Sequence, residues 1–156
     1  MLPPNGVLIQ YLHTGVYLVG KSGVGKSETA LELLDAGAQL VCDDAPLFHV
    51  EDEQVIGSCA EQFYGLMHIR ELGLLDIVRL KSAQHVTARY TVDMIIELVS
   101  PLTDDFHNTV FTPLIRYWYY NNIPIPGIRL SCGASRNISL LVKTAILRYA
   151  LENTIS

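Results

Sequence analysis

Charged side chains are scarce in this sequence, at 17% of its 156 residues, and basic residues are fewer than acidic ones, at 11 against 16. The resulting formal net charge of −5 argues against a general nucleic-acid or membrane-surface binder, because phosphate-rich partners require a basic face. No stretch approaches the roughly 18 apolar residues of a membrane-spanning helix. The chain also begins without the basic residues of an export signal, so we expect a cytoplasmic protein.

Metal-ligand patterns are also missing. The three cysteines, Cys42, Cys59 and Cys132, share no metal-ligand or redox spacing, so we interpret them as plain thiols in a reducing compartment. The five histidines are scattered without paired spacing, and we expect no zinc site.

Apolar residues, by contrast, are abundant, at 49% of the chain, and the mean hydropathy of +0.26 is high for a lone domain. The length fits one domain, which we expect to span residues 1–156 with a single core. The low charge indicates that apolar surface is buried against other copies of the chain. The aromatic run Tyr117–Tyr120, which contains Trp118, is interpreted as core or subunit interface.

The order of apolar patterns predicts an α/β domain. Helical spacing predicts helices over Ser27–Asp35 and Asn137–Leu151. Short apolar runs predict strands over Gly6–Leu12, Gly15–Val19, Gln39–Cys42, Leu47–Val50, Gln54–Ile56, Leu74–Val78, Thr91–Val99 and Ile123–Leu130.

Residues Gly20–Ser27 (GKSGVGKS) match the phosphate-loop pattern G-x-x-x-x-G-K-[ST], between a predicted strand and a predicted helix. Glycines let backbone N–H groups approach phosphate oxygens, the Lys26 ammonium reaches the β- and γ-phosphates, and the Ser27 hydroxyl is a ligand of Mg²⁺. The alternative is a glycine-rich turn without a ligand. The pattern predicts that ATP is bound by Gly20, Lys21, Ser22, Gly23, Val24, Gly25, Lys26, Ser27 and Glu28.

Two adjacent carboxylates, Asp43 and Asp44, close the next predicted strand. They lie at the same sheet edge as the phosphate loop if the two strands are parallel. Near a nucleotide such a pair can hold Mg²⁺ and accept the proton of an attacking hydroxyl. The alternative is a solvated turn before Pro46.

Gly20–Leu34 (GKSGVGKSETALELL), followed by Gly37–Asp44 (GAQLVCDD), resembles the catalytic domain of bacterial HPr kinase/phosphorylase. That family's catalytic domain is a P-loop nucleotide-binding fold with a mixed β-sheet and flanking helices. From the resemblance we expect a form that lacks the extra N-terminal domain of many members. Further agreement lies in Asn5–Ile9, in the signature-like Ile69–Ile77, in Ile123–Pro126 and in Ser135–Ile138.

The resemblance implies phosphoryl transfer between ATP and a serine of HPr, the small carrier of the sugar phosphotransferase system. It also implies the reverse, phosphorolytic reaction and assembly as hexamers. By the resemblance, Lys26 is the phosphate lysine and Ser27 the Mg²⁺ ligand. Asp44, with Asp43 beside it, is the proton acceptor, and Asp44 is also counted among the predicted metal ligands.

The chain departs from the family pattern at three positions. Asn5 stands where the family carries a catalytic His, His68 replaces a Glu that binds Mg²⁺, and Thr109 aligns with an active-site Arg. Imidazole is a poor Mg²⁺ ligand, because Mg²⁺ prefers hard oxygens. Two alternatives to an HPr kinase therefore stay open: a nucleotide-binding regulator with degraded catalysis, and a small-molecule kinase of the same fold.

Overall fold

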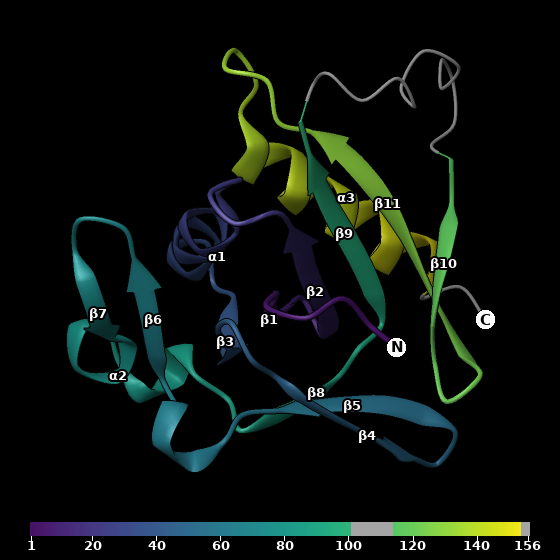
Figure 1. The fold of residues 1–156 in the computed structure, drawn as a ribbon, viewed down its shortest axis with the longest axis horizontal. Coiled ribbons are helices and arrows are strands. Elements are labelled where there is room, and N and C mark those ends of the chain that lie inside the picture. The colour runs from purple at the N-terminus through teal and green to yellow at the C-terminus, as the bar shows by residue number, and fades with distance from the viewer. Residues whose placement is uncertain (101–113, 154–156) are drawn as a thin grey trace.

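The computed structural model describes residues 1–100 and 114–153, and its centre is a six-stranded sheet (Figure 1). In sheet order the strands are β10 (Arg116–Tyr120), β11 (Ile123–Ser131), β9 (Met94–Val99), β2 (Thr14–Gly20), β1 (Val7–Tyr11) and β3 (Gln39–Cys42). β2 is parallel to β9 and β9 is parallel to β11, whereas β1 lies antiparallel between β2 and β3. The carboxyl ends of β2, β3, β9 and β11 therefore meet at one edge of the sheet, where β1 begins.

Two helices, α1 (Lys26–Asp35) and α3 (Ile138–Asn153), cover one face of this sheet (Figure 1). Each presents apolar residues at helical spacing, such as Leu33 and Leu34 of α1 and Val142 and Ile146 of α3. All four side chains are buried in one cluster with the apolar side chains of β1, β2 and β9. This packing fixes the start of α1 beside the end of β2.

The other face is covered by a small antiparallel sheet of β4 (Leu47–Glu51), β5 (Gln54–Ser58) and β8 (Arg89–Thr91). A second apolar cluster fills the space between the two sheets. Phe48 of β4 packs edge-on against Tyr17 with ring centroids 5.2 Å apart. The ring centroid of Tyr120 lies 6.0 Å from that of Phe48. The sequences of β2 and β9 are mostly apolar because these strands are covered on both faces.

A hairpin of β6 (Leu66–Ile69) and β7 (Gly73–Asp76) lies beside α1, followed by the short helix α2 (Ile77–Leu80) (Figure 1). Met67 of β6 and Ile77 of α2 are buried in the same apolar cluster as α1 and hold the hairpin and α2 against it. Two short 3₁₀ segments flank it, η1 (Glu61–Phe63) and η2 (Ala83–His85). The hairpin brings residues far from the phosphate loop in sequence to the same sheet edge.

The predicted α/β fold is confirmed, with local corrections. The strand predicted over Leu74–Val78 ends at Asp76, because the Asp76 carboxylate accepts the Arg79 N–H at 3.2 Å and caps α2. The strand predicted over Thr91–Val99 is two strands in different sheets, separated at Asp93, whose carboxylate accepts the Gly15 N–H at 2.7 Å. β6 and β10 were not predicted. No helix in the described ranges is long and apolar enough to cross a membrane.

The aromatic run divides between core and surface because strand side chains alternate. Trp118 and Tyr120 pack against the second apolar cluster. Tyr117 and Tyr119 point the other way and remain 57% and 55% exposed. The core interpretation therefore holds for two of these residues, and the interface interpretation stays a prediction for the other two.

Candidate active site

The phosphate loop connects β2 to α1, as the sequence pattern predicts. Gly20 comes so close to β9 that a Cβ there would lie 2.6 Å from the carbonyl oxygen of Leu98, and its φ of 149° also favours glycine. Gly25 occupies the N-cap of α1 in the left-handed region, with φ 104°, and offers no side-chain cap. The first N–H groups of α1 therefore remain for an anion such as a phosphate oxygen.

A polar cavity of about 620 Å³ lies over this loop. Eight of the nine predicted phosphate-binding residues line it, and the ninth, Val24, packs against the core instead. The lysine is held at the base of the loop, where the Lys26 ammonium donates to the carbonyl oxygen of Gly20 at 2.5 Å. The lining residues are Pro4, Asn5, Gly20, Lys21, Ser22, Gly23, Gly25, Lys26, Ser27, Glu28, Asp43, Asp44, His68 and Arg70.

Asp43 joins three elements in this cavity. The Ser27 hydroxyl at the start of α1 donates to Oδ1 of Asp43 at 3.0 Å, and the backbone N–H of His68 in β6 donates to Oδ2 at 2.9 Å. Burial raises the pKa of Asp43, and the two hydrogen bonds and the imidazole of His68 moderate the rise, whereas the neighbouring Asp44 adds to it. A desolvated carboxylate against a hydroxyl is a donor set of hard oxygens that suits Mg²⁺. Among the described residues it is Asp43, not Asp44, that contacts Ser27.

Asp44 also lines the cavity but differs from Asp43 in exposure, backbone conformation and hydrogen bonding. It is exposed, it has a left-handed backbone with φ 75°, and its N–H donates to the Gly6 carbonyl at 3.0 Å. Its carboxylate lines the cavity without a hydrogen-bond partner in the part of the chain that the structure describes. An exposed, unpartnered carboxylate can accept a proton from an incoming group, so the two aspartates are equipped for different tasks.

Two of the three departures from the family pattern line the cavity. Asn5 reaches it because β1 runs antiparallel and starts at this edge, and the exposed His68 reaches it from β6. Thr109 lies outside the described residues. The contact of His68 with Asp43 uses the backbone, so any residue at this position can make it.

Arg70 is a site residue that sequence reasoning missed. It follows β6, lines the cavity, and places a guanidinium nitrogen 3.5 Å from where a Cβ on Gly23 would lie. A cation over the phosphate loop can contact phosphate oxygens in the bidentate manner of arginine. Its position within the signature-like Ile69–Ile77 was the available signal.

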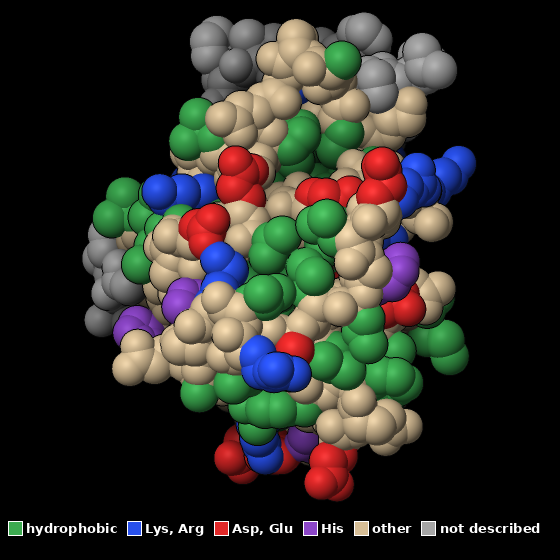
Figure 2. Space-filling model, turned by 90° about the vertical axis from the view of Figure 1, so that its left-hand side faces the viewer, with side chains coloured by type: hydrophobic (Ala, Val, Ile, Leu, Met, Phe, Trp, Pro, Cys, Tyr) green, Lys and Arg blue, Asp and Glu red, His purple; other side chains and the backbone are tan. Residues whose placement is uncertain are grey.

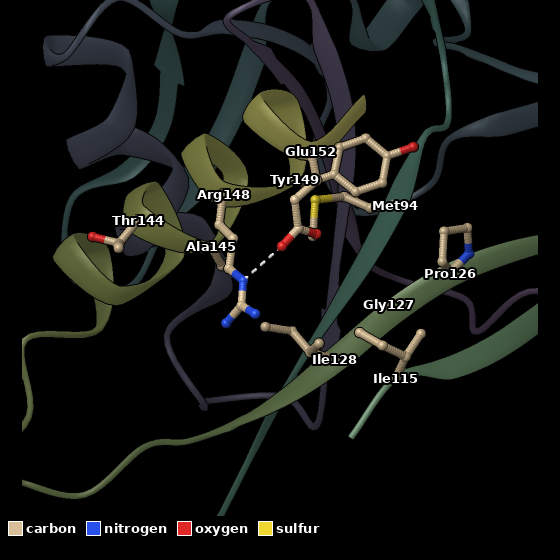
Figure 3. A pocket seen from close by; sticks show the side chains of 10 residues that line it. All are labelled: Met94, Ile115, Pro126, Gly127, Ile128, Thr144, Ala145, Arg148, Tyr149 and Glu152. Atoms are coloured by element: carbon tan, nitrogen blue, oxygen red, sulfur yellow. Dashed lines mark hydrogen bonds and ion pairs between the residues drawn. The ribbon is translucent and has the colours of Figure 1, made fainter. Parts of the chain in front are cut away.

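A second cavity, of about 360 Å³, lies between β11 and the C-terminal part of α3 (Figure 3). It is mainly apolar, with Ile115 and Ile128 on the strand side and an ion pair of 3.0 Å between Arg148 and Glu152 on the helix side (Figure 3). It shares no described residue with the cavity over the phosphate loop. All of the predicted site residues except Val24 line the first cavity.

Comparisons with known proteins point to one family. A family model described as the HPr Serine kinase C-terminal domain matches residues 3–155. The chain is 33% identical over 150 residues to an HPr kinase/phosphorylase of Peptoclostridium acidaminophilum, and 34% identical over 151 residues to one of Polaromonas sp.. These alignments cover 96% and 95% of this chain but 48% and 47% of the relatives, so the chain spans about half their length.

A solved structure is similar over almost its whole length. It is that of the Hpr(Ser) kinase/phosphatase from Coxiella burnetii, with a TM-score of 0.90 and 31% sequence identity. The match covers 95% of this chain and 90% of that chain. Fold and sequence therefore agree on the same family.

Proposed function

Because the chain belongs to the HPr serine kinase C-terminal domain family, we propose that it transfers a phosphoryl group between ATP and a serine of an HPr-like phosphocarrier protein. The observation that carries the proposal is the contact between Ser27 and Asp43 in a cavity that also holds Lys26 and Asp44. A phosphate-binding loop, a hard-oxygen pair and a free carboxylate are the groups that phosphoryl transfer requires.

The donor side of the site consists of the loop and the start of α1. The backbone N–H groups and the Lys26 ammonium bind the phosphates, and Arg70 adds a second positive charge above the loop. Ser27 and Asp43, together with the predicted ligand Asp44, would hold Mg²⁺, which would neutralise the charge on the phosphates.

On the acceptor side, Asp44 is the proposed base. Its carboxylate takes the proton of the serine hydroxyl while the serine oxygen bonds to the γ-phosphorus, and the bond from that phosphorus to the ADP oxygen breaks. In the reverse, phosphorolytic direction inorganic phosphate takes the phosphoryl group to give pyrophosphate, and Asp44 returns the proton to the serine oxygen. Because Asp43 is hydrogen-bonded to Ser27 and His68, Asp44 is the aspartate that is free to exchange a proton.

The surface next to the cavity supports a protein as the acceptor. Hydrophobic side chains are exposed on the side of the molecule that carries β6, β7 and α2 (Figure 2). Leu72, Leu74 and Leu80 are 66%, 65% and 64% exposed there. Such surface apolar groups beside a site are typical of protein-binding regions.

We also propose that the chain assembles into a homo-oligomer, a hexamer by the family resemblance, in the cytoplasm, where ATP is available. β10 ends the central sheet, and its exposed tyrosines, Tyr117 and Tyr119, form apolar surface that a second copy could bury.

A nucleotide-binding regulator with little transfer activity is the second candidate. It is favoured by one observation: at the cavity wall, the resemblance expects a Glu where this chain has the imidazole of His68. A small-molecule kinase stays a third possibility, with Asn5 and His68 adapted to a smaller acceptor.

One experiment separates the three. The protein is incubated with Mg²⁺, γ-labelled ATP and the HPr of its own organism, with a Lys26→Ala variant as control. Label on a serine of HPr supports the proposal. Nucleotide binding without transfer supports the regulator, and label on a small molecule from a metabolite extract supports the third candidate.

A further inference from the structure

Two of the three cysteines meet beside the candidate active site. Cys42 is the last residue of β3 and directly precedes Asp43, whereas Cys59 directly follows β5. The two side chains lie close enough to interact with each other, and both cysteines are free thiols. The third cysteine, Cys132, lies in the loop after β11.

Strand packing independently holds the two cysteines together. A Cβ on Gly57 of β5 would lie 2.2 Å from a methyl carbon of Leu8, so the backbone of β5 rests directly on that side chain. Leu8 is in turn the register partner of Cys42 across β1 and β3. Because Gly57 and Cys59 are two residues apart, the end of β5 is fixed over the end of β3.

The two thiols differ in access. Cys42 is 1% exposed, and Cys59 is half-buried. A solvent-borne oxidant therefore reaches Cys59 first. An accessible thiol next to a second one is the arrangement of a peroxide-sensitive cysteine with its resolving partner.

We propose that Cys42 and Cys59 form a reversible disulfide when the protein meets a hydroperoxide, and that this bond weakens Mg²⁺-dependent nucleotide binding at the adjoining site. The Cys59 sulfur attacks the peroxide O–O bond, giving a sulfenic acid and one molecule of water from hydrogen peroxide, or of alcohol from an organic hydroperoxide. The Cys42 sulfur then displaces the sulfenic oxygen, which leaves as water. The two thiols lose two electrons to the peroxide, and an external dithiol reverses the reaction.

The effect on the site follows from the position of Cys42. Formation of the disulfide draws the two sulfur atoms from non-bonded contact to a separation of about 2 Å. Cys42 is one peptide bond from Asp43, whose carboxylate holds both the Ser27 hydroxyl and the His68 N–H. A shift of the end of β3 therefore reaches the hard-oxygen pair. This second half of the inference rests on the proposed function, whereas the disulfide itself does not.

The test has a chemical arm and a binding arm. The reduced protein is treated with hydrogen peroxide, its free thiols are blocked with N-ethylmaleimide, and its peptides are mapped by mass spectrometry without reduction. We expect a bond between Cys42 and Cys59 in the parent and in the matched control Cys132→Ser, and none in Cys59→Ser. If both cysteines are recovered alkylated, or if Cys132 pairs as readily with either, the disulfide is refuted.

The binding arm compares the affinity for ATP with Mg²⁺ before oxidation, after oxidation and after dithiothreitol. We expect a loss of at least tenfold that dithiothreitol reverses and that Cys59→Ser does not show. An oxidised protein that binds as tightly as the reduced one refutes the regulatory half. If even the reduced protein binds no nucleotide, the proposed function fails, and the peptide map still decides on the disulfide. Diamide, which oxidises thiols without peroxide, repeats the map should Cys59→Ser fold poorly.

Discussion

Replacing Asp43 with Asn should weaken Mg²⁺-dependent ATP binding without lowering the thermal stability of the protein. The substitution keeps the shape of the side chain but removes a charge that burial makes costly in the folded state, as the raised pKa of Asp43 indicates. The amide still accepts the His68 N–H, and its nitrogen can donate to the Ser27 hydroxyl. Two hydrogen bonds to a charged acceptor thus become two neutral ones, a loss of about 1 kcal/mol each.

The raised pKa of Asp43 also predicts how the stability difference between the variant and the parent changes with pH. A folded-state pKa above the ordinary value of 3.8 means that the folded protein binds this proton more tightly than the unfolded chain. The stability contribution of Asp43 is therefore fully present at low pH and is lost as the pH rises through the raised pKa. Asp43→Asn has no such loss. Near pH 4 the variant and the parent should be similar, and the variant should gain relative to the parent up to neutral pH.

Thermal unfolding between pH 4 and 8 measures this difference. At pH 7.5 we expect the Tm of Asp43→Asn to equal or exceed that of the parent by up to about 4 °C, which corresponds to about 1 kcal/mol for a chain of this size. The control is Asp52→Asn, which removes the same charge from an exposed turn with φ 50° and should show no pH-dependent gain. A Tm lowered by more than about 4 °C refutes the reasoning, because the charged hydrogen bonds would then outweigh the cost of burial.

Calorimetry with ATP measures the functional half of the same prediction. In the presence of Mg²⁺ the affinity should fall about tenfold or more, since the variant lacks a charged ligand beside Ser27 and each 1.4 kcal/mol is a factor of ten. Without Mg²⁺ the affinity should change little. Equal affinities with Mg²⁺ for the variant and the parent would mean that Asp43 is not part of the metal site.

Four further predictions test the remaining assignments. Lys26→Ala should weaken ATP binding by about tenfold or more in calorimetry, because a charge-assisted contact to the phosphates is lost. Asp44→Asn should lower the rate of transfer to HPr by about 10²-fold or more while leaving ATP binding without Mg²⁺ intact, and a rate near that of the parent would exclude it as the base. His68→Glu should raise Mg²⁺-dependent transfer, and unchanged or lower transfer would favour a small-molecule acceptor. Light scattering at micromolar concentration should show more than one subunit, and Tyr117→Glu should reduce that number if β10 is an interface.

The position of the phosphate loop between β2 and α1 could be predicted because its sequence pattern is local. Glycine at Gly20 and Gly25, a lysine and a serine within eight positions determine a backbone that binds phosphate wherever a strand precedes and a helix follows. The insertion of β1 between β2 and β3 could not be predicted, because apolar runs predict strands but not their order. That insertion brings Asn5 to the site.

The division of labour between the two aspartates also needed the structure. Side by side in sequence, Asp43 and Asp44 have the same chemistry, and only a left-handed backbone at Asp44 turns one toward Ser27 and leaves the other exposed. The paired carboxylates in the sequence placed Asp44 among the predicted metal ligands, and that stays a prediction. The geometry adds Asp43 to the set on the strength of a 3.0 Å contact with Ser27.

At His68 the backbone and the side chain contribute to the site in different ways. Its N–H secures Asp43 at 2.9 Å whatever the side chain, so the framework of the site does not depend on the residue chosen there. Only the group presented to the cavity changes, from the carboxylate expected by the resemblance to an imidazole. A substitution with this property alters the chemistry of a site while preserving its shape, which is why His68→Glu is informative: the exposed position tolerates the exchange, and any change in transfer reports on the ligand itself.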